Sequence, residues 1–381
     1  CSRLLEYAMS TGNQGGDGVA RAGSRLIFVD VMKGVSIVAV VVTHGLPPFF
    51  DSHISDLLSF AVPCFLFSSG FLFRPKKPQK HLEVLKKRLQ RILLPYLVAS
   101  CWAWVFRWFA GHTITVSICL DDLISGEAFG PYYYVIVITC LTFFVPLLSS
   151  VPGALQWLAL GLGIAAQIQG AWLHRSIFWE IRSPQHWWGF FLSGWLGASP
   201  CIQKWTSLGA SRALPWLCIA ALVASFGALM LLERNYLLQV LWKHVVPFCG
   251  MVLIDDRQEE TVLNLLRWLS SQSFTIYLYH RHFQFLLEAA MPATLAFHAG
   301  QLDTLFGLLR LLGRLAVLTV FGMAGSCAVA SFGPKLLGDV WAELLLGCKS
   351  LAPPEQSQRS EVELQGRQTM AKAGASATPD K

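Results

Sequence analysis

The amino-acid sequence predicts an all-α, polytopic membrane protein with about ten transmembrane helices in one bundle. Three observations support this prediction: 54% of the 381 residues are hydrophobic, only 14% are charged, and the apolar residues gather into segments of spanning length. An ordinary soluble domain carries about 25% charged residues. A soluble fold could not bury this much apolar surface without exposing large patches, whereas lipid solvates such surface directly.

Ten apolar segments approach the length of about 20 residues that a helix needs to cross a bilayer. The fourth, fifth and seventh carry no charged residue, the sixth is the shortest, and the eighth contains Lys243 and His244. In chain order, the predicted spans are residues 27–46, 56–73, 92–110, 131–149, 154–172, 185–201, 213–232, 236–254, 272–292 and 312–333.

Basic residues predict how the spans are oriented, because Lys and Arg gather in cytoplasmic connections. The stretch Arg74–Arg91 is by far the most basic connection, whereas the connection before it, Gly45–Ser55, has neither Lys nor Arg. We therefore expect a multi-pass protein of the cell inner (plasma) membrane with both termini in the cytoplasm. This orientation places Arg310 and Arg314 on the outer side, contrary to the expected cytoplasmic position of basic residues.

Composition divides the chain into three regions. Residues 1–24 form a polar N-terminal segment without an apolar stretch, so no signal peptide is expected there. Residues 25–348 form one transmembrane domain, and residues 349–381, rich in Gln, Ser and Ala, are expected to be a disordered cytoplasmic tail.

The net charge of +7 comes largely from basic residues at the ends of apolar segments, which predicts no nucleic-acid partner. The ten cysteines form no CxxC pair, so no metal site is expected.

The first span carries three ionisable side chains, Asp30, Lys33 and His44, at helical spacing. Lys33 and His44 are eleven residues apart, almost three turns, so they share a face about 16 Å apart. An ionisable group inside a span is costly and is therefore a functional candidate. Histidine suits a general base that takes a proton from a sugar hydroxyl, or a nucleophile that briefly carries an acyl group. The alternative is an interfacial histidine beside Pro47 and Pro48, and the first span alone favours neither interpretation.

The third span opens with Arg88 and Arg91, which are neighbours on one helical face at the predicted cytoplasmic surface. Guanidinium groups bind phosphates through fixed forks of donors. A cytoplasmic acyl-CoA carries such phosphates and is a plausible ligand. The alternative is that these arginines anchor the helix at anionic lipid headgroups.

Lys243 and His244 lie inside the eighth span near Pro247. Charged groups within a membrane usually face protein interiors or cavities, so both are candidates for an acceptor cavity. The alternative is that this span is misplaced and both side chains reach the interface.

Four motifs occur in order along the chain, and a run of three tyrosines after Gly130 and Pro131 accompanies them. The motifs are Arg25–His44, Val62–Phe71, Lys87–Tyr96 and Ser273–His280. Together they resemble the acyltransferase 3 family of integral membrane acyltransferases, closest to the branch that modifies exported polysaccharides and includes the intercellular adhesin acylation protein. The resemblance covers residues 25–285 and extends to about residue 333. One departure is Lys33, which stands where the family has an arginine and lacks the bidentate fork of that side chain.

The resemblance implies ten or eleven helices, a cytoplasmic acyl-CoA donor such as acetyl-CoA, and a glycan acceptor. It implies that His44 is the essential catalytic histidine and that Arg88 and Arg91 serve the donor. From their place on the same helical face, we expect Asp30 and Lys33 to orient and polarise this catalytic site. The expected substrate-binding residues, from the motifs and from the eighth span, are Ser69, Tyr277, His280, Lys243 and His244.

The sequence therefore predicts transfer of an acyl group, most simply acetyl, from acyl-CoA to a hydroxyl of a cell-envelope glycan or exopolysaccharide. The expected partners are membrane lipid and a glycan or lipid-linked saccharide acceptor, and the oligomeric state stays open. One alternative is a polysaccharide exporter or flippase without catalytic activity, because many helices with polar residues at the midplane also suit transport. Another is a different class of membrane O-acyltransferase built around His280.

Overall fold

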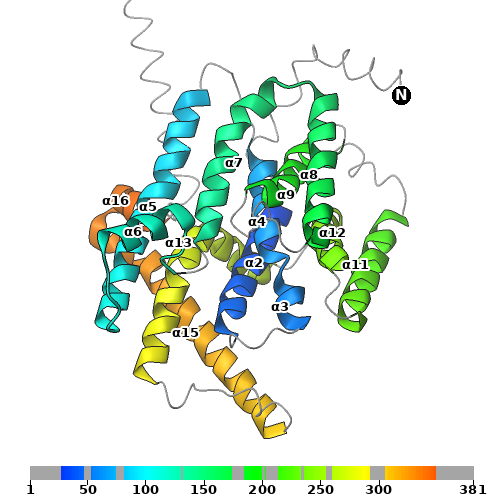
Figure 1. Ribbon diagram of the computed structural model, residues 1–381. Coiled ribbons are helices and arrows are strands. Elements are labelled where there is room, and N and C mark those ends of the chain that lie inside the picture. Colours follow the sequence, from blue (N-terminus) through cyan, green and yellow to red (C-terminus); the bar gives the residue numbers. More distant parts are fainter. Residues whose placement is uncertain are drawn as a thin grey trace, which may run out of the picture. The chain divides into compact units, whose positions relative to one another are not determined.

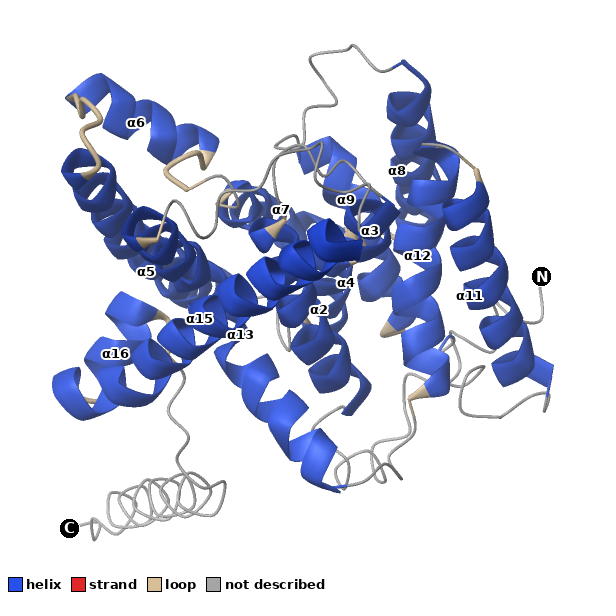
Figure 2. Ribbon diagram, turned by 90° about the horizontal axis from the view of Figure 1, so that it is seen from below, coloured by secondary structure: helices blue, strands red, loops and turns tan. Residues whose placement is uncertain are grey.

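In the computed structural model of the protein, helices account for all the regular structure of the described residues, and no strand occurs among them (Figures 1 and 2). The predicted segments 1–24 and 349–381 lie outside the described residues, as do Pro47, Pro48 and residues 74–80 of the basic stretch Arg74–Arg91. The structure describes residues 27–46, 53–73, 81–129, 132–173, 184–199, 202, 213–232, 236–254, 260–291 and 305–348.

A helix occupies each of the ten predicted spans. In chain order these helices are α2 (Ile27–Gly45), α4 (Ala61–Leu72), α5 (His81–Phe109), α7 (Tyr133–Ser150), α8 (Gly153–Leu173), α9 (Pro184–Gly197), α11 (Ala213–Leu231), α12 (Tyr236–Leu253), α13 (Glu260–Ala290) and α15 (Leu305–Leu337). Three short helices were not predicted, because none has the length of a span. They are α3 (His53–Leu58), α6 (Val116–Ser125) and α16 (Asp339–Leu346).

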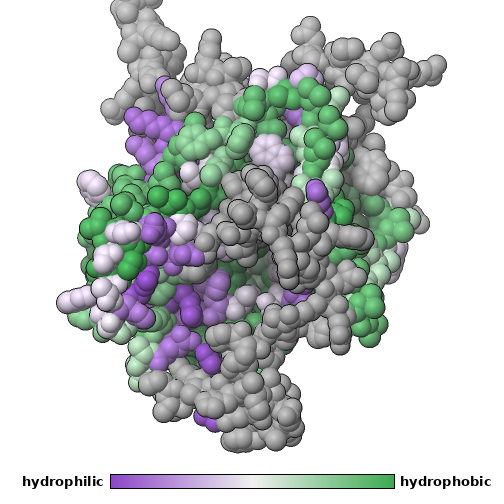
Figure 3. Space-filling model, viewed as in Figure 1, coloured by the Kyte–Doolittle hydropathy of each residue, from purple (hydrophilic) through white to green (hydrophobic). Residues whose placement is uncertain are grey.

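Five stretches of the described helices are long and apolar enough to cross a membrane, and two shorter helices are apolar as well. Helices such as α8 and α11 expose apolar side chains, which colour the surface green in Figure 3. Exposed Leu and Trp side chains in such numbers are stable only in lipid. The prediction of an all-α, polytopic membrane protein is confirmed. The five stretches are Ile27–Gly45, Ile54–Leu72, Leu85–Phe109, Ala213–Leu231 and Leu309–Leu337.

The chain divides into two compact units, each assembled from two separate stretches of sequence. The first unit comprises Cys1–Pro75 and Leu147–Ser273, and the second comprises Lys76–Pro146 and Phe274–Lys381. Helix α13 begins in the first unit and ends in the second. The assignment of residues 25–348 to one transmembrane domain remains a prediction.

The first unit is held together by close crossings at glycine. A Cβ atom on Gly70 of α4 would collide with the Phe191 carbonyl of α9, and one on Gly194 of α9 would collide with the Phe67 carbonyl of α4. Small residues allow membrane helices to approach backbone to backbone, where many van der Waals contacts form. The glycine of the motif Val62–Phe71 is therefore explained by helix packing.

The second unit packs around aromatic and histidine side chains. The Tyr132 hydroxyl donates a hydrogen bond to the Leu278 carbonyl at 2.6 Å, and its ring meets that of Tyr96 edge to face. The Tyr96 hydroxyl donates to the Leu123 carbonyl at 2.9 Å, which ties α5 to α6. Helix α16 packs on both α5 and α15. Backbone carbonyls buried in this unit thus receive side-chain donors from neighbouring elements.

Candidate active site

One face of α2 carries the predicted catalytic side chains. The helix runs continuously from Ile27 to Gly45, with Asp30 in its first turn and His44 in its last. Between Lys33 and His44 the same face contains Ile37, which is fully buried. Because residues three, four and eleven apart share a helical face, Lys33 and His44 both lie on the side that packs into the protein.

Asp30 and Lys33 are joined through one serine of α13. The Ser270 hydroxyl donates a hydrogen bond to Asp30 Oδ1 at 2.7 Å, and Lys33 Nζ donates to the Ser270 carbonyl at 3.3 Å. Asp30 is buried and Lys33 is half-buried. A carboxylate and an ammonium group within a span are stable only with such partners. The prediction did not include Ser270, because its 240-residue separation from Asp30 leaves no sequence signal.

Close approach of α2 to α13 makes this network possible. A Cβ atom on Gly34 would stand 2.8 Å from the Leu266 carbonyl oxygen. Glycine at this position therefore allows the two backbones to meet, and the side chains of Asp30 and Lys33 reach Ser270. Gly34 has a positioning role that the sequence alone did not indicate.

His44 is half-buried in the last turn of α2. Thr43 beside it donates its hydroxyl proton to the Ala39 carbonyl at 2.8 Å, which satisfies a polar group within the helix. A half-buried imidazole at a helix end combines access for a reactant with a position fixed by the helix. Such a side chain can act as a general base or as an acyl acceptor.

The two predicted donor-binding arginines differ in their surroundings. Arg88 is half-buried on α5, whereas Arg91 is exposed and its Nε lies 3.0 Å from Glu343 Oε1 of α16. This ion pair was not predicted, because nothing in the sequence indicated the short helix α16. Exposed ion pairs of this kind stabilise a fold only weakly, so a phosphate ligand can compete with the carboxylate.

The three predicted substrate-binding residues of the first unit lie on two helices, one on α4 and two on α12. Ser69 is half-buried on α4, next to the glycine crossing. His244 Nε2 lies 2.7 Å from Gln167 Oε1 of α8, and its ring is tilted by 32° against Phe190 of α9 at 4.3 Å between centroids. Lys243 is half-buried on the same helix as His244. His244 thus ties α12 to α8 and α9, and the acceptor-binding role of these residues remains a prediction.

Tyr277 and His280 are both buried on α13 in the second unit. Tyr277 meets Tyr134 edge to face at 5.3 Å, which accounts for one tyrosine of the predicted aromatic run. His280 Nδ1 lies 3.0 Å from the Ile276 carbonyl and 2.9 Å from the Tyr277 carbonyl. Since both neighbours are acceptors, Nδ1 is the protonated nitrogen, and a neutral His280 carries its lone pair on Nε2.

His282 is a second buried histidine of α13 and is not among the predicted site residues. Its Nε2 lies 3.0 Å from the Ala99 carbonyl of α5 and donates to it. Its ring lies among aromatic rings, with Phe129 at 4.7 Å and Phe106 at 5.6 Å between centroids. The sequence gives no sign of these partners, which come from distant helices and loops.

An ion-pair cluster explains part of the charge pattern that ran against the predicted orientation. Arg314 of α15 pairs with Glu288 of α13 at 3.1 Å, and Arg281 lies 3.6 Å from the same carboxylate. Arg314 is therefore compensated within the protein and contributes little to the orientation signal. The positions of Arg314 and Glu288 show that this charge serves helix packing.

The comparison with protein families agrees with the motifs and their order. The acyltransferase 3 family, described as an acyltransferase domain, matches residues 26–331 of the 381-residue chain. No curated protein and no solved structure matches the chain. The match covers α2, α4, α5, α12 and α13, which carry the predicted site residues. The chain belongs to the acyltransferase 3 family and is a membrane acyltransferase.

Proposed function

We propose that the protein transfers an acetyl group from acetyl-CoA to a hydroxyl of a cell-envelope glycan or exopolysaccharide, in the cell inner membrane with both termini cytoplasmic. In this reaction His44 takes the proton of the acceptor hydroxyl while its oxygen attacks the thioester carbonyl. A carbon–oxygen bond forms, the carbon–sulfur bond breaks, and the CoA thiolate leaves and takes up a proton. The imidazole is then free to return its proton to solvent.

The observation that carries this proposal is the position of His44 on α2. Its side chain is half-buried on a face whose other members pack inside the protein, above the Asp30–Ser270–Lys33 network. A carrier has no evident use for an imidazole held in this way, whereas an acyltransferase needs a base or a nucleophile. The network fixes the opposite end of α2 and so helps to hold His44 in place.

Arg88 and Arg91 contribute to this proposal as phosphate-binding residues of the donor. Guanidinium groups match phosphate geometry with two parallel hydrogen bonds, and CoA carries three phosphate groups. Arg88 and Arg91 lie three residues apart on one face of α5. Because the ion pair of Arg91 with Glu343 is weak, a phosphate of the donor can replace the carboxylate.

The decisive experiment compares His44→Ala with His112→Ala, which changes an exposed histidine in the loop after α5. The purified variants are incubated with acetyl-CoA labelled in the acetyl group and with candidate glycans. We expect His44→Ala to reduce label on the glycan by about 10²–10⁴-fold, the range typical of general acid–base catalysis. His112→Ala should transfer label at the rate of the unchanged protein.

Near-normal transfer by folded His44→Ala would exclude this mechanism. Label retained on the protein when acceptor is omitted, and lost in His44→Ala, would assign the histidine the role of acyl carrier in place of general base. Glycan transported without label would support the exporter, and complete loss of transfer in His280→Ala with activity in His44→Ala would support the class built around His280.

A further inference from the structure

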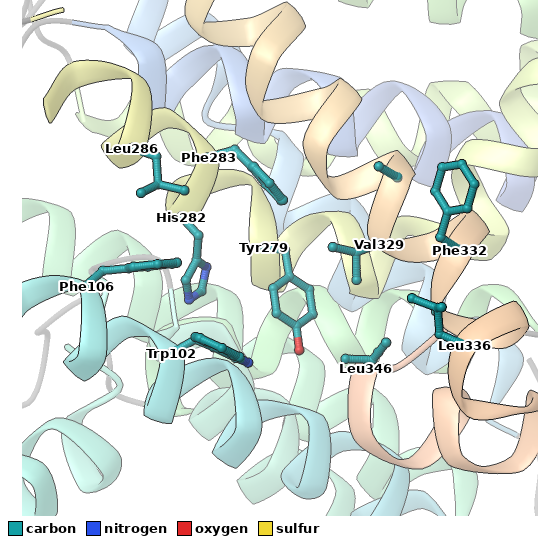
Figure 4. Close-up of a pocket in the computed structure, with 12 residues that line it drawn as sticks. Trp102, Phe106, Tyr279, His282, Phe283, Leu286, Val329, Phe332, Leu336 and Leu346 are labelled. Atoms are coloured by element: carbon teal, nitrogen blue, oxygen red, sulfur yellow. The ribbon is translucent and has the colours of Figure 1, made fainter. Parts of the chain in front are cut away.

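A cavity of about 440 Å³ lies within the second unit between α5, α13, α15 and α16 (Figure 4). Its walls are almost entirely apolar, with Trp102, Phe332 and Leu346 among them. The volume lies within the range of about 300–1,000 Å³ that ligand sites occupy. Water gains few hydrogen bonds in such a cavity, so an apolar ligand fits it better.

The cavity is long and follows two helices. Its lining extends from Tyr279 to Leu286 on α13 and from Ala328 to Leu336 on α15. At about 1.5 Å of rise per residue, these walls are roughly 10 and 12 Å long. An unbranched hydrocarbon chain has this shape.

The rim of the cavity lies on surface that faces lipid. Trp102 is 50% exposed, Phe332 is 57% exposed and Leu336 is 82% exposed. They belong to α5 and α15, two of the helices whose length and composition suit a membrane span. Because lipid surrounds such surface, a ligand can enter sideways from the hydrocarbon layer.

Two buried side chains with hydrogen-bond donors line this cavity: His282, which donates to the Ala99 carbonyl, and Tyr279. Tyr279 is only 5% exposed, and its hydroxyl has no hydrogen-bond partner among the described residues. In Figure 4 its ring stands among the lining side chains with the hydroxyl toward Trp102 and Leu346. A buried hydroxyl without an acceptor is unfavourable, so a ligand that supplies a carbonyl oxygen would satisfy it.

We propose that this cavity binds one acyl chain of a bilayer glycerophospholipid, whose ester carbonyl accepts the proton of the Tyr279 hydroxyl. The phospholipid supplies the two features that the cavity requires, a linear hydrocarbon chain and a neutral acceptor at its end. None of the residues proposed for acyl transfer lines this cavity, and the proposal involves no covalent step.

The test uses the full chain in lipid nanodiscs that contain a phosphatidylcholine with a diazirine in one acyl chain. After illumination, crosslinked residues are mapped by peptide mass spectrometry. We expect crosslinks to concentrate on residues 279–286 and 328–336. Val329→Trp fills the cavity and should reduce them at least tenfold, whereas Tyr279→Phe removes only one hydrogen bond and should reduce them about fivefold.

The matched control is Val320→Trp, which adds the same side chain to an exposed position of α15 outside the cavity lining. It should leave the crosslinks unchanged. If Val329→Trp fails to fold, as judged by size-exclusion chromatography, the nearly isosteric Tyr279→Phe decides the question. Crosslinks spread evenly over α15 and insensitive to Tyr279→Phe would overturn the proposal, as would competition by long-chain acyl-CoA but not by unlabelled phospholipid.

Discussion

The two units differ in how closely the backbones of their helices approach one another. In the first unit, glycines at positions 34, 70 and 194 bring backbones into direct contact, and a charged network forms where α2 meets α13. In the second unit, tyrosine and histidine side chains bridge to backbone carbonyls, and a cavity of about 440 Å³ remains between the helices. Helices whose backbones touch cannot shift without a clash, whereas helices joined through side chains can leave a cavity between them. The rigid unit therefore suits a side chain that must be positioned, and the other suits a ligand that must be accommodated.

The largest expected effect follows from adding volume at the α4–α9 crossing. Gly70→Val places a side chain where a Cβ atom alone would collide with the Phe191 carbonyl. A backbone carbonyl cannot move without shifting its helix, so we expect a loss of about 3 kcal/mol or no folded protein at all. Thermal unfolding of the detergent-purified protein, followed by size-exclusion chromatography, measures this loss.

Gly161→Val is the matched control, because Gly161 of α8 has no atom within 4 Å of a Cβ atom placed there. This variant should unfold within a few degrees of the unchanged protein. Equal stability of both variants would show that the first unit does not depend on close backbone contact.

A smaller effect is expected from Ser270→Ala, which removes the hydrogen bond to Asp30 Oδ1. Hydrogen bonds to charged groups contribute about 1.5–3 kcal/mol, and the buried carboxylate is left with one donor fewer. We expect a stability loss in that range and reduced acetyl transfer by the folded fraction, because α2 also carries His44. Measurement combines thermal unfolding with transfer rates normalised to folded protein.

Ser225→Ala provides the control for Ser270→Ala. Both serines are almost fully buried, but the Ser225 hydroxyl bonds only within its own helix, to the Ala221 carbonyl at 2.6 Å. Its loss should be smaller and should leave transfer unchanged. A transfer rate for Ser270→Ala equal to that of Ser225→Ala would mean that the network does not position the catalytic helix.

In the second unit, His282→Phe keeps an aromatic ring but removes the donor to the Ala99 carbonyl. One such hydrogen bond contributes about 1 kcal/mol, and the aromatic surroundings accept a phenyl ring. We therefore expect a modest decrease in thermal stability, with His112→Phe, at an exposed position, as the neutral control. A loss as large as that of Gly70→Val would show that the second unit is as rigid as the first.

The apolar pattern predicted most of the fold. All ten spans coincide with helices, because a bilayer demands long apolar segments with internally paired backbones. The short helices α3, α6 and α16 carry no such signal. The end signals of α6 become clear only in the structure. The Thr115 side chain caps its start, and Gly126, with φ of 74°, ends it.

The sequence predicted the relation of site residues on one helix, but not the contacts between residues of different helices. Asp30, Lys33 and His44 share a face because helical spacing alone fixes that relation. Ser270, by contrast, reaches Asp30 from another helix, and no periodicity reports such a contact. Glu343 escaped prediction for the same reason, although its partner Arg91 was identified as a candidate for donor binding.

The smallest expected effect concerns that last pair and tests the donor-binding role of the second unit. Glu343→Gln removes the carboxylate that competes for Arg91, at a cost to stability below about 1 kcal/mol because the pair is exposed. If Arg91 binds a donor phosphate, CoA should bind up to about fivefold more tightly. Equilibrium binding of CoA at two salt concentrations measures the change.

Asp339→Asn removes another carboxylate from α16 and controls for net charge. Tighter binding in both variants would indicate a general charge effect, and no change in Glu343→Gln would remove Arg91 from the donor site.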